Sequence, residues 1–137
     1  MADFINTQTI DQTVSRPEQA KTSFLVAAAT TDGVNVDQHF GRADTFGIFE
    51  VAGDVITDTG EVRRVAPACH GGSHEDSHLA ANARAIADCK YVLVARIGNQ
   101  AEAECCEAGV IPMEIPGDIR AAVKKIRDYE KIQALFE

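Results

Sequence analysis

The chain lacks three features that would assign it to a broad class at once. It has no apolar run near the ~18 residues that a membrane-spanning helix needs. Its N-terminus has neither a basic start nor an apolar stretch, so no secretory signal is predicted and a cytoplasmic location is expected. Basic residues are also too few for a sequence-independent grip on nucleic acid, since 13 Lys and Arg face 21 Asp and Glu.

Cysteine is sparse and is not arranged as a common metal motif. The four cysteines are Cys69, Cys89, Cys105 and Cys106, and no two of them form a C-x-x-C pair. A standard structural zinc site is therefore disfavoured, and in the cytoplasm free thiols are expected. Cys89 directly precedes an apolar run, which predicts a thiol in the core. One of the adjacent pair Cys105 and Cys106 is predicted to pack and the other to be partly exposed.

The order of apolar segments predicts one α/β domain. Residues 1–22 are polar and without sustained periodicity, which is typical of a flexible N-terminal tail or linker, and residues 23–137 form the domain. Predicted helices start near Ser73, Asn99 and Asp118. Ala87 is expected on the buried stripe of the first helix and Tyr129 on the buried face of the third, and Gly109 is expected to end the second. The order is βββαβαβα, which fits a ribonuclease H-like three-layer fold with a mixed five-stranded sheet. The predicted strands cover residues 24–29, 45–51, 55–65, 91–95 and 110–115. A three-residue hairpin loop, Ala52-Gly53-Asp54, is expected between the second and third strands, and Gly60 is expected to bend or bulge the third.

This topology brings polar loops to one edge of the sheet. All the strands except the second run in the same direction, so the segments after their carboxyl ends converge, and ligands of open α/β sheets bind at such an edge. The helix N-termini near Ser73 and Asn99 open there as well and favour anions. An anionic, metal-containing ligand is therefore expected. The converging candidates are His39, Arg42, Cys69, His70, His74 and Arg96.

The histidines give this site its metal-binding character. His70, His74 and His78 follow Cys69 closely in a glycine-broken segment, and imidazole and thiolate are ligands that zinc and iron–sulfur clusters accept. Cys69, His70 and His74 are candidate metal ligands, whereas His78 is expected to be solvated. His39 is either a ligand or a turn histidine bonded to the backbone.

Two tracts carry a resemblance to a known family. The tract V-D-Q-H-F-G-R-A at residues 36–43, together with A-D-C-K-Y-V-L-V-A-R-I-G at residues 87–98, resembles the dinitrogenase iron–molybdenum cofactor biosynthesis family, of the NifX, NafY and C-terminal NifB type. The likeness runs from about Phe24 to Tyr129. It implies a ribonuclease H-like fold and the binding or carriage of an iron–sulfur precursor or iron–molybdenum cofactor. It also implies that His39, the histidine of the H-F-G tract, helps to hold the cluster.

The resemblance favours a carrier or chaperone that is not an enzyme. Its expected partners are nitrogenase assembly proteins or apo-dinitrogenase, with no nucleic acid and no membrane, and the chain is expected to be a monomer or weak dimer. No C-x₃-C-x₂-C run is present for radical S-adenosylmethionine chemistry. One alternative is a small metal-binding or redox-responsive module. The other is a metal-dependent nuclease-like enzyme, which is disfavoured because residues 24–29 carry no carboxylate.

Overall fold

The computed structural model describes residues 23–66 and 75–136, and a mixed five-stranded sheet forms its centre. The sheet order is β5-β4-β2-β6-β7. β4 pairs antiparallel with both β2 and β5, whereas β2, β6 and β7 pair in parallel. The strands are β2 (Ser23–Ala29), β4 (Thr45–Ala52), β5 (Val55–Arg64), β6 (Tyr91–Val94) and β7 (Ile111–Glu114).

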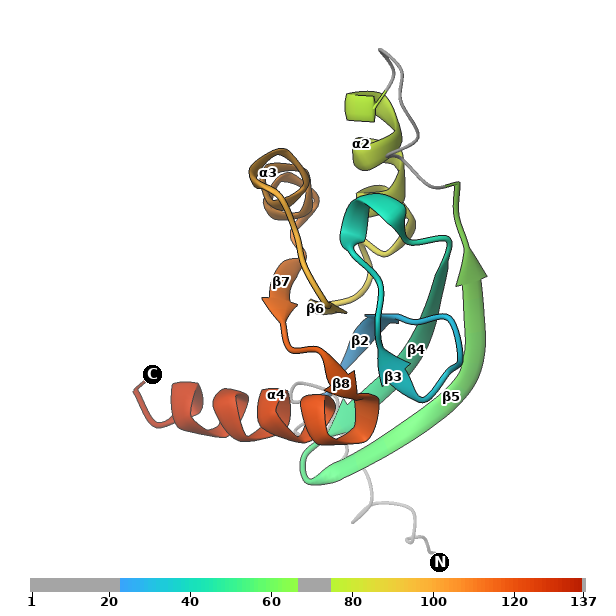
Figure 1. The fold of residues 1–137 in the computed structure, drawn as a ribbon. Helices are drawn as coiled ribbons and strands as arrows, with labels where there is room; N and C mark the ends of the chain where they lie inside the picture. Colours follow the sequence, from blue (N-terminus) through green and yellow to red (C-terminus); the bar gives the residue numbers. More distant parts are fainter. Residues whose placement is uncertain (1–22, 67–74, 137) are drawn as a thin grey trace, which may run out of the picture.

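Helices cover both faces of this sheet (Figure 1). Side chains alternate along β2 and β6, so Ala27 and Val92 enter one core cluster while Val26 and Leu93 enter the other. The first cluster lies under α2 (Glu75–Ala85) and α3 (Asn99–Ala108), and the second lies under α4 (Ile119–Ala134). The predicted three-layer α/β fold with its mixed five-stranded sheet is therefore confirmed.

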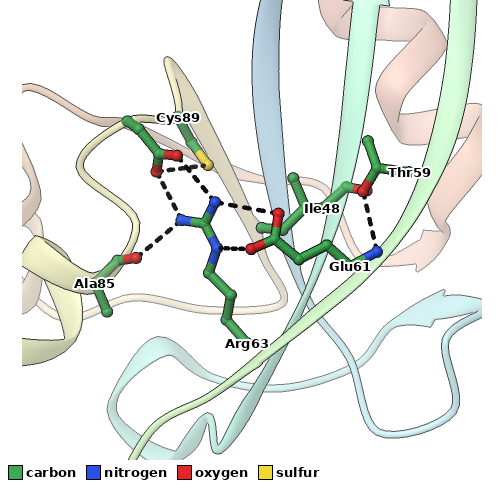
Figure 2. Close-up of polar contacts among 7 residues, drawn as sticks. Ile48, Thr59, Glu61, Arg63, Ala85 and Cys89 are labelled. Atoms are coloured by element: carbon green, nitrogen blue, oxygen red, sulfur yellow. Dashed lines mark hydrogen bonds and ion pairs between the residues drawn. The ribbon is translucent and has the colours of Figure 1, made fainter.

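The hairpin between β4 and β5 differs from expectation in one detail. Ala52 pairs with Val55, so the connection is the two residues Gly53 and Asp54 and not a three-residue loop. The bulge predicted at Gly60 is present, because the register shifts opposite Ile48 and Gly60 has φ of 80°. The Thr59 hydroxyl donates to the Ile48 carbonyl at 2.7 Å, which secures the bulge (Figure 2).

Arg63 fastens β5 to the turn that follows α2. Its guanidinium donates to both carboxylate oxygens of Asp88, at 2.6 and 2.9 Å, and its Nε donates to Glu61 at 2.8 Å. Nη1 also donates to the Ala85 carbonyl at 3.0 Å, in the last turn of α2 (Figure 2). A single guanidinium thus joins the edge strand of the sheet to the end of a helix.

The helix ends follow the local sequence signals. Gly109 ends α3 in the left-handed region, with φ of 84°, and the Asp118 carboxylate caps α4 by accepting from the Ala121 N–H at 3.0 Å. Tyr129, expected on the buried face of α4, is 43% exposed. Ala87, assigned to the buried stripe of α2, is exposed and lies beyond the helix end. No helix within residues 23–66 and 75–136 is long and apolar enough to cross a membrane.

A second, two-stranded sheet was not predicted. β3 (Asn35–Val36) pairs antiparallel with β8 (Gly117–Asp118), and the Ile119 N–H donates to the Val34 carbonyl at 2.9 Å. These short strands tie the loop after β2 to the start of α4. They lack a run of alternating apolar residues, which is the signal that identifies longer strands in a sequence.

Candidate functional site

Two loops that carry predicted site residues meet beyond the carboxyl ends of β2 and β6. His39 and Arg96 form a parallel backbone bridge. The Phe40 N–H donates to the Arg96 carbonyl and the Ala95 N–H donates to the Gln38 carbonyl, each at 2.9 Å. The predicted meeting of the His39 and Arg96 segments at one edge is therefore confirmed by direct hydrogen bonds.

The His39 loop is held firmly from within. The Asp37 carboxylate accepts from the backbone N–H and the hydroxyl of Thr31, at 2.9 and 2.5 Å. Phe40 is fully buried and packs against Phe46, with ring centroids 6.0 Å apart. A short 3₁₀ helix, η1 (Phe40–Arg42), follows directly. His39 lies just before this anchor with its side chain exposed, so its imidazole faces solvent from a fixed backbone.

Asp32 stabilises the first turn of the same loop. Its carboxylate accepts from the backbone N–H groups of Asn35 and Val34 at 2.9 and 2.8 Å. These bonds hold the pKa of Asp32 well below its ordinary value, because they favour the ionised carboxylate. The Asp32 carboxylate thus stabilises the conformation of the loop, and Asp32 does not line the hollow described next.

A hollow of about 530 Å³ opens between the His39 loop, the Arg96 segment and the helices α2 and α3. Among the side chains that the structure describes, no carboxylate lines it, although the chain carries a formal net charge of −8. In the part of the chain that the structure describes, neither Arg42 nor Arg96 joins a side-chain hydrogen bond or ion pair. The lining residues are His39, Gly41, Arg42, Leu79, Arg96, Ile97, Gly98, Asn99, Gln100 and Ala101.

The N-terminus of α3 forms one wall of this hollow. Gly98 is the N-cap and supplies no side-chain cap, and the first helical bond runs from the Glu102 N–H to the Gly98 carbonyl. Among the described residues, no backbone acceptor takes the N–H groups of Asn99, Gln100 or Ala101. Free N–H groups at a helix start carry partial positive charge and bind anions. They add to the two guanidiniums, so the hollow suits an anionic ligand.

The structure assembles only part of the predicted ligand set. His39, Arg42 and Arg96 line one hollow, as the sequence predicts. Cys69, His70 and His74 lie outside the described residues, as does Ser73, near which the first helix is predicted to start. Within residues 23–66 and 75–136, no three His, Cys, Asp or Glu side chains lie together as a metal site would require. Metal ligation at this edge is therefore a prediction that rests on His39 and on residues beyond the described part.

Ala66, the last described residue before the gap at 67–74, is hydrogen-bonded to α2, the helix that also contributes to the hollow. The buried side chain of Asn82 in α2 donates to the Ala66 carbonyl at 2.7 Å, and Leu79 of the same helix lines the hollow. His78 is half-buried and its Nδ1 is shielded from solvent, so the expectation of a solvated side chain is wrong. The neighbouring Leu79 packs into the core below the hollow.

Two of the three described cysteines are not candidates for ligation in this fold. Cys89 and Cys105 are buried, and burial raises the pKa of each thiol to about 12. Thiols of this kind stay protonated at neutral pH and do not act as thiolate ligands. The prediction of a core thiol at Cys89 is confirmed, and of the adjacent pair Cys105 is packed while Cys106 is exposed.

Leu79, Gln100 and Ala101 line the hollow but are not among the site residues that the sequence predicts. The helix start predicted at Asn99 is the signal that could have found Gln100, since the first turn of that helix faces the edge. Glu114, whose carboxylate accepts from the Ile97 N–H at 2.9 Å, has no such signal.

Comparison with known proteins places this architecture in a family. A family model described as dinitrogenase iron-molybdenum cofactor matches residues 22–129. The FeMo cofactor biosynthesis protein NifB of Sinorhizobium fredii is 40% identical over 88 residues, which cover 64% of this chain and 18% of that protein. Protein NifX of Klebsiella pneumoniae is 28% identical over 96 residues, or 70% of this chain and 59% of that protein.

A solved structure shares the fold. The crystal structure of PH0822 superposes with a TM-score of 0.54 at 25% sequence identity, covering 76% of this chain and 88% of that one. The chain spans about a fifth of the NifB protein named above and about three fifths of NifX. The likeness to NifB therefore concerns one region of a much longer protein.

Proposed function

Because the chain belongs to the dinitrogenase iron-molybdenum cofactor family, we propose that it binds and carries an iron–sulfur precursor or iron–molybdenum cofactor during cofactor assembly. The observation that supports this most is the hollow lined by His39, Arg42 and Arg96, which no carboxylate of the described side chains lines in an otherwise acidic chain. The cluster is cargo, and the chain acts as a carrier or chaperone without catalysing a reaction on it.

The chemistry of the hollow fits an anionic inorganic cargo. The exposed imidazole of His39 supplies one nitrogen ligand of a type that iron accepts. The guanidiniums of Arg42 and Arg96 and the free N–H groups of α3 offset negative charge without bonding to metal. A cluster held by few direct ligands can be released to an acceptor, which is what a carrier requires.

Further ligands and partners belong to the same proposal. Cys69, His70 and His74, which follow β5 in sequence, are proposed as additional metal ligands. The acceptor is a nitrogenase assembly protein or apo-dinitrogenase, met in the cytoplasm by a monomer or weak dimer. The activities of full-length NifB are not part of the proposal, since the chain covers only 18% of such a protein.

Anaerobic binding of isolated iron–molybdenum cofactor tests the proposal. The wild-type chain should gain broad visible absorption and should retain iron and molybdenum after gel filtration. His39→Ala should weaken retention strongly while the melting temperature stays unchanged, because the exposed imidazole contributes little to the core. A chain that stays colourless but binds zinc tightly would support the small metal-binding module instead.

The two arginines provide the electrostatic test. Arg42→Gln and Arg96→Gln should each weaken binding by about tenfold, the scale of one charge-assisted hydrogen bond of ~1.5 kcal/mol. The double variant should depart from additivity, since both residues act on one ligand. Arg120→Gln is the matched control, because Arg120 is also exposed but lies on α4, across the sheet from the hollow. Arginine variants that bind like this control would contradict the assigned role of the hollow.

A further inference from the structure

The segment Arg96–Gly98, which lines one side of the hollow, begins just beyond the point where the parallel pairing of β6 and β7 ends. The two strands pair up to Val94 and Glu114, and the Ile115 N–H still donates to the Val94 carbonyl at 3.1 Å. The chain then leaves β7 towards β8 and α4 (Figure 1). Arg96, Ile97 and Gly98 thus continue past the end of β6, and no described strand lies beside them on the β7 side.

The Glu114 side chain accepts a hydrogen bond from this segment on the side where β7 has ended. Its Oε2 accepts from the Ile97 N–H at 2.9 Å, and this is the only hydrogen bond recorded for that side chain among the described residues. On the β2 side the same segment is held by the Phe40 N–H and the Gln38 carbonyl. Residues 95–97 are therefore fixed from both sides, by backbone on one and by a carboxylate on the other.

Two features of the hollow depend on this segment. Arg96 precedes Ile97 directly and lines the hollow, and Gly98 follows Ile97 as the N-cap of α3. A shift of Ile97 would move both the guanidinium and the helix N-terminus relative to His39. Glu114 does not line the hollow itself, so its effect on a ligand passes through the backbone of Ile97.

We propose that Glu114 is a positioning residue that holds Arg96 and the N-terminus of α3 in place around the anionic cargo. The inference rests on the proposed function for the identity of the cargo, but its structural part stands without it. The carboxylate has two opposing effects. Its hydrogen bond orders the wall of the hollow, whereas its negative charge repels an anion bound nearby.

These two effects separate in a pair of substitutions. Glu114→Gln keeps a side-chain oxygen that accepts from the Ile97 N–H and removes the charge, so the cargo should bind as tightly as in wild type or more tightly. Glu114→Ala removes the acceptor, so affinity should fall by about three- to tenfold, the range expected for a lost orienting hydrogen bond. Glu107→Ala is the control, because Glu107 is an exposed acid near the far end of α3.

Two measurements on the three variants decide the matter. Amide hydrogen exchange, followed by NMR without cargo, should show Ile97 protected in wild type and Glu114→Gln but exchanging faster in Glu114→Ala. Affinity for isolated iron–molybdenum cofactor is then measured anaerobically alongside the melting temperature. A positioning role predicts a loss of affinity in Glu114→Ala with a restored value in Glu114→Gln, at similar melting temperatures.

The outcomes distinguish this inference from the proposed function. Unchanged Ile97 exchange in Glu114→Ala overturns the positioning role, whatever the chain binds. Faster exchange with wild-type affinity also overturns it, since the order of the wall would then be irrelevant to the cargo. Equal weakening in both Glu114 variants also overturns it, because Glu114→Gln keeps an acceptor for the Ile97 N–H and should restore the affinity. A wild-type chain that binds no cofactor defeats the proposed function, while the exchange experiment still tests the contact.

Discussion

Replacing Arg63 by glutamine should destabilise the fold by about 1–2 kcal/mol. Arg63 makes a two-bond contact with Asp88, a second ionic contact with Glu61 and a bond to the Ala85 carbonyl. An exposed ion pair contributes ~0.2–1 kcal/mol, and a charge-assisted bond in a better-shielded setting contributes ~1.5–3 kcal/mol. The Arg63 side chain is 20% exposed, but its partners are 54% and 49% exposed and regain water when it is removed. The free energy of unfolding should therefore fall by about 1–2 kcal/mol, which lies around the upper end of the first range and the lower end of the second.

The assay is thermal or urea unfolding, with Arg64→Gln as the matched control. Arg64 is the next residue in β5, is exposed, and has no side-chain hydrogen bond or ion pair among the described residues. A loss of 1–2 kcal/mol corresponds to a drop of roughly 3–8 °C in the melting temperature for a domain of this size. A drop in Arg63→Gln no larger than in the control would refute the assigned role.

The dependence on pH provides a second check of the same contact. The hydrogen bond from Arg63 holds the pKa of Asp88 below its ordinary value. A carboxylate whose folded pKa is depressed stabilises the fold above its unfolded pKa of about 3.9, and this contribution is lost as pH falls through the folded pKa. The stability difference between wild type and Arg63→Gln should therefore be full at pH 7 and should shrink in acid. A constant difference across this range would exclude the Asp88 contact as its source.

Three further outcomes follow from the core and the helix caps. Cys89→Ala should cost about 1–2 kcal/mol in urea unfolding, as expected for a small truncation at a fully buried site, and should leave cofactor binding unchanged. Thiol labelling at neutral pH should modify Cys106 in the native protein and spare Cys89 and Cys105, as peptide mass mapping would show, because burial raises the pKa of both to about 12. Asp118→Ala should lose the cap of α4 and about 1 kcal/mol of stability, with Asp118→Asn largely restoring it. Rapid native labelling of Cys89 would contradict its burial.

The hollow can be foreseen from the sequence only through topology. Strand order and direction are encoded locally, so the loops with His39 and Arg96 could be predicted to meet at one edge. Their direct backbone bridge could not, because it depends on how far each chain continues past its strand. Arg42 lines the hollow beside His39 and Arg96 because a short 3₁₀ helix places it there, and no periodicity in the sequence predicts that helix. The ligand roles of Cys69, His70 and His74 stay predictions.

The sequence by itself determined the elements and their order. Short apolar runs predict β2 and β6, Gly109 predicts the end of α3, and Asp118 predicts the cap of α4, because each signal acts on neighbouring residues. The expected flexible tail at residues 1–22 lies outside the described part of the chain and stays a prediction.

Only the tertiary structure decided which polar side chains meet. Glu114 bonds to Ile97, Arg63 bonds to Asp88, and no carboxylate among the described side chains lines the hollow. Such contacts join residues that are distant in sequence, and their energy depends on geometry within a few tenths of an ångström. The local periodicity of the sequence does not encode the distances and angles of these contacts. The sequence therefore predicts that a site forms at this edge, and packing determines which charges it presents.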